Sequence, residues 1–127
     1  MYFGKVQAWT SVLDTPVPFA TVMNTNNKTS ANNGKITVNS AGYYNVDCEL
    51  TVSGVATDVT ATIYADGVAT TNTSTVTLDT TDDFDTLSLA DAIKVTRSQY
   101  PNLATIDVRI APVGITVTGT MRVELVQ

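Results

Sequence analysis

Histidine is absent from this 127-residue chain, and cysteine occurs once, as Cys48. Without histidine the chain lacks the usual general base and the commonest metal ligand, which argues against most hydrolase mechanisms. A single cysteine excludes an intrachain disulfide. Because Cys48 alternates with polar residues in one apolar series with Val46 and Leu50, we expect a buried structural thiol and not a reactive one.

Charged residues are scarce, at 15% of the chain, and long apolar runs are missing. Seven basic and twelve acidic residues give a net charge of −5, and the basic residues do not cluster along the sequence. Nucleic-acid binding requires clustered cations that neutralise phosphates, so nucleic acid is not an expected partner. No apolar run approaches the roughly 20 residues that span a bilayer, and the N-terminus has no apolar segment typical of a signal peptide. The composition therefore predicts a soluble protein without a membrane partner.

Apolar residues do not recur at helical spacing, and alternate with polar ones instead. The clearest case is residues 34–52, with the sequence GKITVNSAGYYNVDCELTV. Two alternating segments there flank a corner of small residues, at which Gly42 is free to adopt a positive φ. We expect two strands joined by a hairpin-like corner, with Val46, Cys48 and Leu50 facing inward.

The same alternation continues through the rest of the chain. In residues 4–13 it places Lys5 and Trp9 on one face and Val6 on the other. Further extended segments are predicted at residues 19–23, 59–64, 75–79, 84–96, 105–111 and 115–125. Asp66-Gly67 predicts a tight hairpin, Gly119 predicts a bulge or bend, and the polar residues 24–34 and 97–104 predict exposed loops.

One core is possible at this chain length. The pattern predicts a single all-β domain over residues 1–127, an antiparallel β-sandwich. Residues 1–13 are expected either to form its first strand or to project as an N-terminal arm.

Two segments, GKITVNSAGYYNV at 34–46 and ATIYADGVA at 61–69, resemble the C1q and tumour-necrosis-factor (TNF) family of jelly rolls. In that family a strand leads into a Gly-Tyr corner, and a later strand ends in a short hairpin carrying Asp-Gly or Asn-Gly. The segments TLSLADAIKV and GTMRVELVQ resemble the later strands of small C1q-like proteins encoded in bacteriophage and prophage genomes. The chain lacks the Gly-X-Y stalk of collagen-linked members.

The resemblance implies a homotrimer of jelly rolls around a three-fold axis. For the phage members it also implies a non-enzymatic structural role on the capsid surface of the virion, as a head decoration or head fibre. The expected partners are then other copies of the chain and capsid or other virion proteins, with no catalytic residue and no cofactor. The alternative is a carbohydrate- or receptor-binding module on a virion or cell surface, with a host-surface glycan as partner.

Aromatic and apolar residues are the candidate contacts for a neighbouring subunit or the capsid. They are Met1, Tyr2, Phe3, Trp9, Tyr43, Tyr44 and Tyr64. The tyrosines, together with Tyr100, are expected to pack at a trimer interface, or alternatively to serve as stacking platforms for sugars.

Carboxylates gather once in the sequence, at Asp79, Asp82, Asp83 and Asp85. Hard cations such as Ca²⁺ take several oxygen ligands, which makes these four residues a weak candidate metal site. Their spacing differs from the D-x-D-x-D-G calcium loop, so a solvated turn is the preferred interpretation. Asp47 and Glu49 could be imagined as a glycosidase pair, but both belong to the polar face of one strand, where no cleft is implied.

Overall fold

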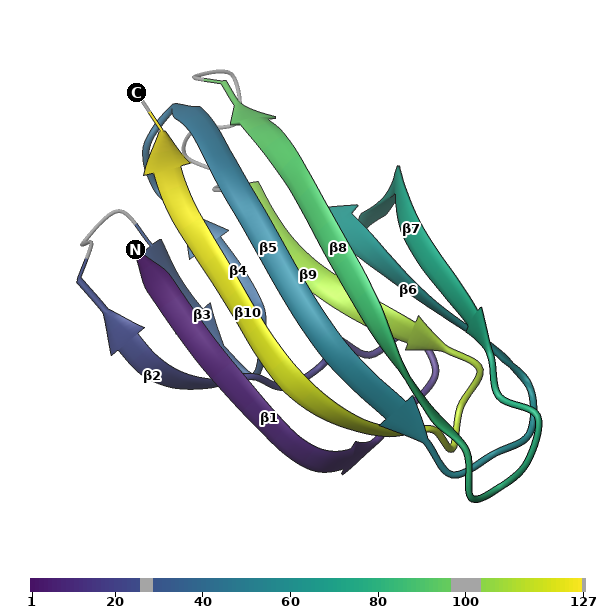
Figure 1. Cartoon of the computed structure of the whole chain (residues 1–127). Coiled ribbons are helices and arrows are strands. Elements are labelled where there is room, and N and C mark those ends of the chain that lie inside the picture. Colours follow the sequence, from purple (N-terminus) through teal and green to yellow (C-terminus); the bar gives the residue numbers. More distant parts are fainter. Residues whose placement is uncertain (26–28, 97–103, 127) are drawn as a thin grey trace.

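The computed structural model describes residues 1–25, 29–96 and 104–126, and these residues form β-strands and no helix. Two five-stranded antiparallel sheets pack face to face (Figure 1). Sheet A has the order β2-β1-β10-β5-β8, and sheet B has the order β3-β4-β9-β6-β7. The predicted antiparallel β-sandwich is confirmed.

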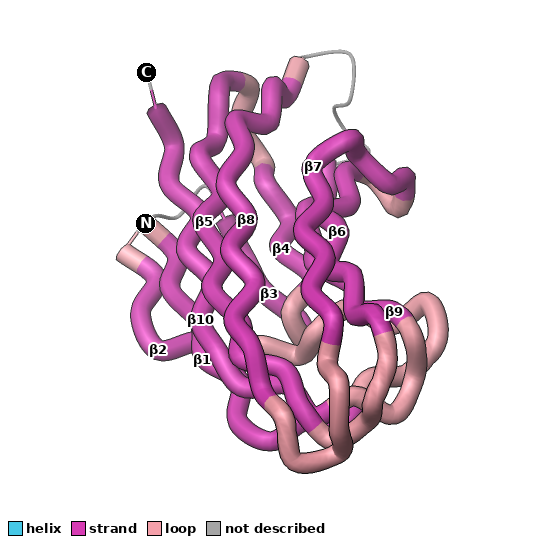
Figure 2. The backbone as a smooth tube through the Cα atoms, turned by 45° about the vertical axis from the view of Figure 1, so that its right-hand side comes forward, coloured by secondary structure: helices cyan, strands magenta, loops and turns pink. Residues whose placement is uncertain are grey.

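The strand bounds are as follows. Sheet A contains β1 (Tyr2–Thr10), β2 (Ala20–Asn24), β5 (Gly42–Ser53), β8 (Phe84–Val95) and β10 (Thr116–Val126). Sheet B contains β3 (Thr29–Asn32), β4 (Lys35–Val38), β6 (Asp58–Ala65), β7 (Val68–Thr77) and β9 (Ala104–Ala111). Figure 2 shows that loops gather at one end of the sandwich, where β9 meets β10 and β7 meets β8.

The core lies between the sheets and is built from alternate side chains of facing strands. On β5 the inward series includes Val46, Cys48 and Leu50, each at most 1% exposed, as the alternation predicts. Ile63 of β6 and Ile106 of β9 are equally buried from the opposite sheet. Each such aliphatic side chain contributes about 1.5–3 kcal/mol of transfer free energy when fully buried.

The corner at residues 39–41 joins the two sheets and does not close a hairpin. β4 pairs with β3 and β9, whereas β5 pairs with β10 and β8. The predicted hairpin-like corner is therefore wrong about pairing, because a one-sided alternating strand looks the same whether its successor lies beside it or in the opposite sheet. The hydroxyl of Tyr44 donates to the carbonyl oxygen of Ser40 at 2.8 Å and fixes this corner.

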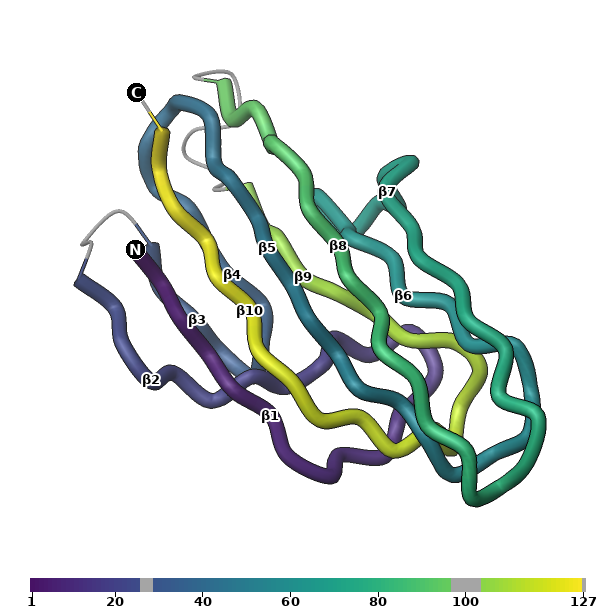
Figure 3. The backbone as a smooth tube through the Cα atoms, viewed as in Figure 1, coloured from purple at the N-terminus to yellow at the C-terminus, as the bar shows by residue number. Residues whose placement is uncertain are grey.

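Residues 1–13 supply the first strand and not a projecting arm. β1 pairs with β10 on one side and β2 on the other, so the first and last strands of the chain lie side by side (Figure 3). The register shifts by one residue between Val6 and Trp9, where Ala8 has a φ of 51° and donates its N–H to Thr118 Oγ1 at 2.9 Å. This bulge turns Trp9 to the same face as the buried Val117. The predicted placement of Trp9 on the face of Lys5, opposite Val6, is therefore wrong.

The bulge or bend predicted at Gly119 of β10 lies instead at Ala8 of β1, the strand that pairs with β10. Gly119 pairs with Val6 on β1 and with Leu50 on β5. A Cβ on Gly119 would lie within 2.1 Å of the Glu49 carbonyl oxygen. Glycine is needed at position 119 because the backbone of β5 lies too close for any side chain.

One predicted loop contains a strand. β3 lies within residues 24–34 and pairs with β4 through a two-residue turn, at which Asn33 and Gly34 have φ values of 51° and 82°. An Asn-Gly pair is a strong hairpin signal. The exposed loop predicted from the polar composition of residues 24–34 is therefore wrong for β3. The hairpin predicted at Asp66-Gly67 is confirmed, with φ values of 54° and 76°. Tyr100 and most of the predicted loop 97–104 lie outside the described residues.

Replacing Gly119 by alanine tests the close approach of β5 and β10. We expect Gly119→Ala to lower the free energy of unfolding by about 3 kcal/mol, because the new methyl group meets rigid backbone. Gly67→Ala is the matched control, since a Cβ there has no neighbour within 4 Å and only the left-handed φ opposes it, at a cost of about 1 kcal/mol. Urea denaturation of both variants measures the difference. Equal losses would contradict the close approach.

Labelling of Cys48 tests the structural role of its thiol. Burial, followed by the charge of Glu49, raises the pKa of the Cys48 thiol to about 12. At pH 8 we expect a disulfide reagent to modify Cys48 only at the rate of unfolding, and rapid stoichiometric labelling of folded protein would contradict this. Above about pH 9 the unfolded chain releases the thiol proton while the folded chain keeps it. The free energy of unfolding should therefore fall more steeply with rising pH in the wild type than in Cys48→Ala.

Candidate functional site

A pocket of about 80 Å³ lies on the outer face of sheet B, where β6 and β9 run side by side. We call it the β6–β9 pocket. Its lining residues are Leu13, Asp14, Thr60, Thr62, Tyr64, Arg109, Ile110, Ala111, Pro112 and Val113. A buried water needs roughly 10–15 Å³ of such space, so the pocket has room for several waters or for part of a small organic ring.

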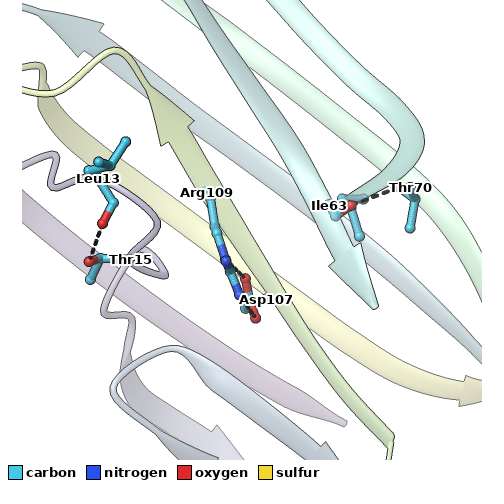
Figure 4. A network of polar contacts seen from close by, with 6 residues as sticks. All are labelled: Leu13, Thr15, Ile63, Thr70, Asp107 and Arg109. Atoms are coloured by element: carbon cyan, nitrogen blue, oxygen red, sulfur yellow. Dashed lines mark hydrogen bonds and ion pairs between the residues drawn. The ribbon is translucent and has the colours of Figure 1, made fainter. Parts of the chain in front are cut away.

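The polar centre of this site is an ion pair on β9. Arg109 Nε donates to Asp107 Oδ1 at 2.9 Å, and Nη2 approaches Oδ2 at 3.5 Å (Figure 4). Asp107 is completely buried although it belongs to the outward-facing series of its strand, and the Arg109 side chain is 19% exposed. The hydrogen bond that Arg109 donates to Asp107 raises the pKa of Arg109 above its ordinary value, so the guanidinium stays charged. A buried carboxylate without its partner would cost about 3–5 kcal/mol, which makes Arg109 part of the local structure.

Tyr64 holds the guanidinium from the neighbouring strand. The guanidinium carbon of Arg109 lies 4.1 Å from the centroid of the Tyr64 ring, at a distance that gives a cation–π contact. Within the described part of the chain Nη1 of Arg109 donates no hydrogen bond. The guanidinium is therefore fixed in position by two partners while one of its nitrogens is left for a ligand.

The turn at residues 12–15 forms one wall of the pocket. Pro16 bridges to Arg109 and the N–H of Val17 donates to the carbonyl oxygen of Val108 at 2.8 Å, so the chain after the turn runs along β9. Thr15 Oγ1 donates to the carbonyl oxygen of Leu13 at 2.9 Å within the turn (Figure 4). Asp14 adopts a left-handed φ of 51°, a conformation that aspartate tolerates better than most residues.

Ser11 fastens this turn to the loop between β9 and β10. Its hydroxyl donates to the carbonyl oxygen of Pro112 at 2.8 Å and accepts the N–H of Ile115 at 2.9 Å. The N–H of Ser11 donates to Ile115, and its carbonyl oxygen accepts from Gly114 at 3.0 Å. Because Ser11 is buried, these bonds hold both loops around the pocket in one arrangement.

The open face of sheet A is the second candidate surface, and it carries charges of both signs. The six charged side chains, which project away from the core, are Lys5, Lys94, Arg122, Asp47, Glu49 and Glu124. None of the six forms an ion pair with another side chain in the part of the chain that the structure describes. Asp47 and Glu49 lie on this open face, as their alternation predicts.

Aromatic and apolar residues accompany these charges at two corners of the same face. Tyr43 and Val126 are paired neighbours and are 49% and 39% exposed, and Lys94 Nζ lies 5.8 Å from the Tyr43 ring. Phe3 of β1 and Met23 of β2 are also paired, and Met23 is exposed.

The candidate contact residues fall into different environments. Tyr2 and Tyr44 are completely buried in the chain's own core, so their expected role in subunit or capsid contact is corrected: they have no surface to offer a partner. Trp9 packs against the same core. Burial raises the pKa of both tyrosine hydroxyls. Tyr64 lies on the outer face of sheet B and contributes to the β6–β9 pocket.

The remaining contact candidates keep exposed area. Phe3 and Tyr43 lie on the open face of sheet A. Met1 is half-buried at the end of β1 and is paired with Thr25, whose N–H donates to its carbonyl oxygen at 3.0 Å. Contact with a subunit or capsid stays a prediction for Met1, Phe3 and Tyr43, and for the partly buried Trp9 and Tyr64.

The structure does not bring the four candidate metal-binding aspartates together. Asp83 accepts the N–H groups of Asp79 and Phe84 at 3.1 and 3.0 Å, and Asp85 accepts the N–H of Thr86 at 2.8 Å. These carboxylates cap the turn between β7 and β8 and the open edge of β8. In the described ranges no group of three or more His, Cys, Asp or Glu side chains could hold a metal ion. The same ranges contain no helix long and apolar enough to cross a membrane.

Sequence patterning identifies Asp107 and Arg109 only as polar positions of a strand. An alternating pattern does not distinguish a buried outward residue from a solvated one, because burial depends on neighbours from other strands, such as Tyr64 of β6, which pairs with Asp107. The one local signal is the pairing of opposite charges two residues apart on one face of a strand in a chain that has few charges.

No protein-family model matches the chain, and no curated protein matches it significantly. Solved structures do match. Murine APRIL at pH 5.0 superposes with a TM-score of 0.69 at 13% identity, over 95% of this chain and 97% of that one. The globular domain of zebrafish complement 1qA gives 0.67 at 8% identity, over 94% and 92%. Eiger TNF from S. frugiperda gives 0.69 at 10% identity, over 99% and 86%.

At these identities the likeness concerns the fold alone, and it extends over nearly the whole of each chain. The matches confirm the fold that the sequence resemblance implied, whereas the bacteriophage role stays a prediction. The chain therefore folds as an all-β, C1q/TNF-like jelly roll.

Proposed function

We propose that the chain is a non-enzymatic structural module of a bacteriophage virion, which trimerises through the open face of sheet A and decorates the capsid surface or forms part of a head fibre. The C1q/TNF-like fold supports this role, together with the resemblance of residues 86–95 and 119–127 to the later strands of small phage C1q-like proteins. The observation that carries the trimer is the set of six charged side chains on the open face of sheet A, which form no ion pair among the residues that the structure describes.

The balance of these charges favours contact between copies of the chain. The face holds three cations and three anions, although the whole chain has a net charge of −5. Two such faces can meet without net repulsion if the cations of one copy oppose the anions of the next. Paired charges of this kind fix register and exclude wrong partners more than they add affinity.

The apolar residues at the corners of the face supply the affinity. Exposed ion pairs contribute about 0–1 kcal/mol each, whereas aromatic side chains dominate interface energetics. Tyr43 and Phe3 lie on different strands at different corners of the face. A three-fold assembly joins unlike patches of neighbouring copies, and this separation provides two unlike patches.

Reversal of one central charge tests the interface. Arg122 lies on β10 between Phe3 of β1 and Asp47 of β5. We expect wild-type protein to sediment as a trimer at micromolar concentration, and Arg122→Glu to sediment mainly as monomer, because the substitution removes the central cation and adds an anion beside Asp47. Sedimentation velocity distinguishes the two states.

Lys35→Glu is the matched control, since Lys35 is exposed on β4 of sheet B and its reversal changes the net charge equally. The control should remain trimeric. A monomeric wild type would refute the assembly, and a trimeric Arg122→Glu would place the interface on another face. The virion role is tested separately, by locating the chain in cryo-EM maps of intact particles from the phage or prophage that encodes it; its absence from the particles would refute that role.

A carbohydrate- or receptor-binding module is the second candidate function. The β6–β9 pocket favours it, because a fixed arginine, a carboxylate and threonine hydroxyls meet there beside exposed apolar side chains. This function is compatible with the first, since a capsid-surface protein is exposed to host glycans.

A further inference from the structure

We infer that the β6–β9 pocket binds one neutral sugar residue of a surface glycan or polysaccharide, with Asp14 and Arg109 as its principal hydrogen-bonding groups. The inference deepens the second candidate function and rests on it. It does not depend on trimer formation or on a place in the virion, because every lining residue belongs to one chain and to the face opposite the open face of sheet A.

The polar groups of the pocket suit neighbouring hydroxyls. Arg109 Nη1 offers two N–H donors, and the Asp14 carboxylate offers acceptors. Thr60 and Thr62 add hydroxyls that donate or accept, although Thr60 Oγ1 already shares a hydrogen bond with Thr75 at 2.9 Å. A sugar hydroxyl both donates and accepts, so it can bond a carboxylate and a guanidinium at the same time.

The charges of the site decide between neutral and charged ligands. Arg109 is neutralised by the buried Asp107, and Asp14 adds a further negative charge to the lining. The sum over these three groups is −1, so an anionic sugar, carboxylate or phosphate would enter against net repulsion. A cationic group would meet the guanidinium at the pocket floor. A neutral ring with hydroxyls avoids both costs.

The apolar side of the pocket matches the C–H face of a sugar ring. Leu13 is 72% exposed and Val113 is 53% exposed at the mouth, and Pro112 lies with them. One side of the Tyr64 ring is covered by Arg109, so the ring acts mainly by holding the guanidinium. A pocket with an apolar wall and a few convergent polar groups is the usual form of a small-ligand site.

The pocket is also preorganised. Ser11 joins the two loops that form its walls, and the guanidinium has two fixed partners. Asp14 keeps a left-handed backbone at the tip of its turn, a conformation that non-glycine residues rarely adopt and that often marks functional positions. Little order has to be created when a ligand enters, which favours measurable binding by a small molecule.

Amide NMR titration of the full chain tests the inference. The probes are the methyl glycosides of glucose, galactose, mannose and N-acetylglucosamine at millimolar concentration, with N-acetylneuraminic acid and glucosamine as the anionic and cationic arms. We expect at least one neutral glycoside to shift the amide signals of residues 12–15, 60–64 and 109–113, and to bind more tightly than either charged sugar.

Asp14→Asn provides the decisive variant, because asparagine also tolerates the left-handed backbone and only the charge is lost. The affinity for the neutral glycoside should fall about tenfold, as expected when a charge-assisted hydrogen bond is weakened. Asp82→Asn is the matched control: this exposed aspartate lies in the turn between β7 and β8 and does not line the pocket, so binding should be unchanged.

Three outcomes overturn the inference. If Asp14→Asn strengthens binding, or N-acetylneuraminic acid is the preferred ligand, the site is an anion site. If a sugar binds but shifts other signals, or a glycan array is positive while the pocket signals stay unchanged, the module binds carbohydrate elsewhere and only the pocket assignment fails. If neither the probes nor the array gives binding, the carbohydrate-binding function fails as well.

Discussion

One extra residue in the first strand, Ala8, determines which of the following side chains face the core and where the next turn lies. The bulge at Ala8 shifts the pairing of β1 with β10 by one residue, so the side chains after it change faces. Trp9 then packs on the core, and Ser11 becomes buried where it can bond four backbone groups of the loop after β9. The turn that follows Ser11 is thereby held over β9. Without the bulge, alternation would point Trp9 to solvent.

The two sheets consequently present different outer faces. On sheet B, Leu13 and Asp14 form one wall of a pocket beside Arg109, whereas the outer face of sheet A has no such wall from the described residues. The outward carboxylate of Asp107 on sheet B is completely buried, whereas Asp47 and Glu49 on the open face of sheet A are exposed. The cost of burying Asp107 is offset by Arg109, which Tyr64 holds from the next strand. Asp107 therefore helps to fix Arg109 in its position at the β6–β9 pocket.

Period-two patterning predicted the all-β sandwich, most of the strands and the inward series of β5. Pairing partners were less predictable, because alternation reports burial of one face and not the identity of the neighbouring strand; the corner after β4 is the example. The bulge at Ala8 has no signal in the composition. Alternation alone therefore places Trp9 on the face of Lys5 and not on the face of Val6, which it occupies. The pocket was unpredictable for a related reason: Asp14 and Arg109 are 95 positions apart and meet only because Ser11 is anchored.

The placement of the two surfaces on opposite sheets has a functional consequence. If three copies associate through sheet A, each pocket on sheet B faces outward and stays accessible. Single sugar residues bind weakly, but three linked sites engaging one polysaccharide raise the overall affinity by about 10²–10⁴-fold without any new contact. Each pocket can then remain small and shallow, with binding strength supplied by the assembly. On this reasoning each copy carries a complete pocket, and association through sheet A would add avidity to a site that releases a single sugar quickly.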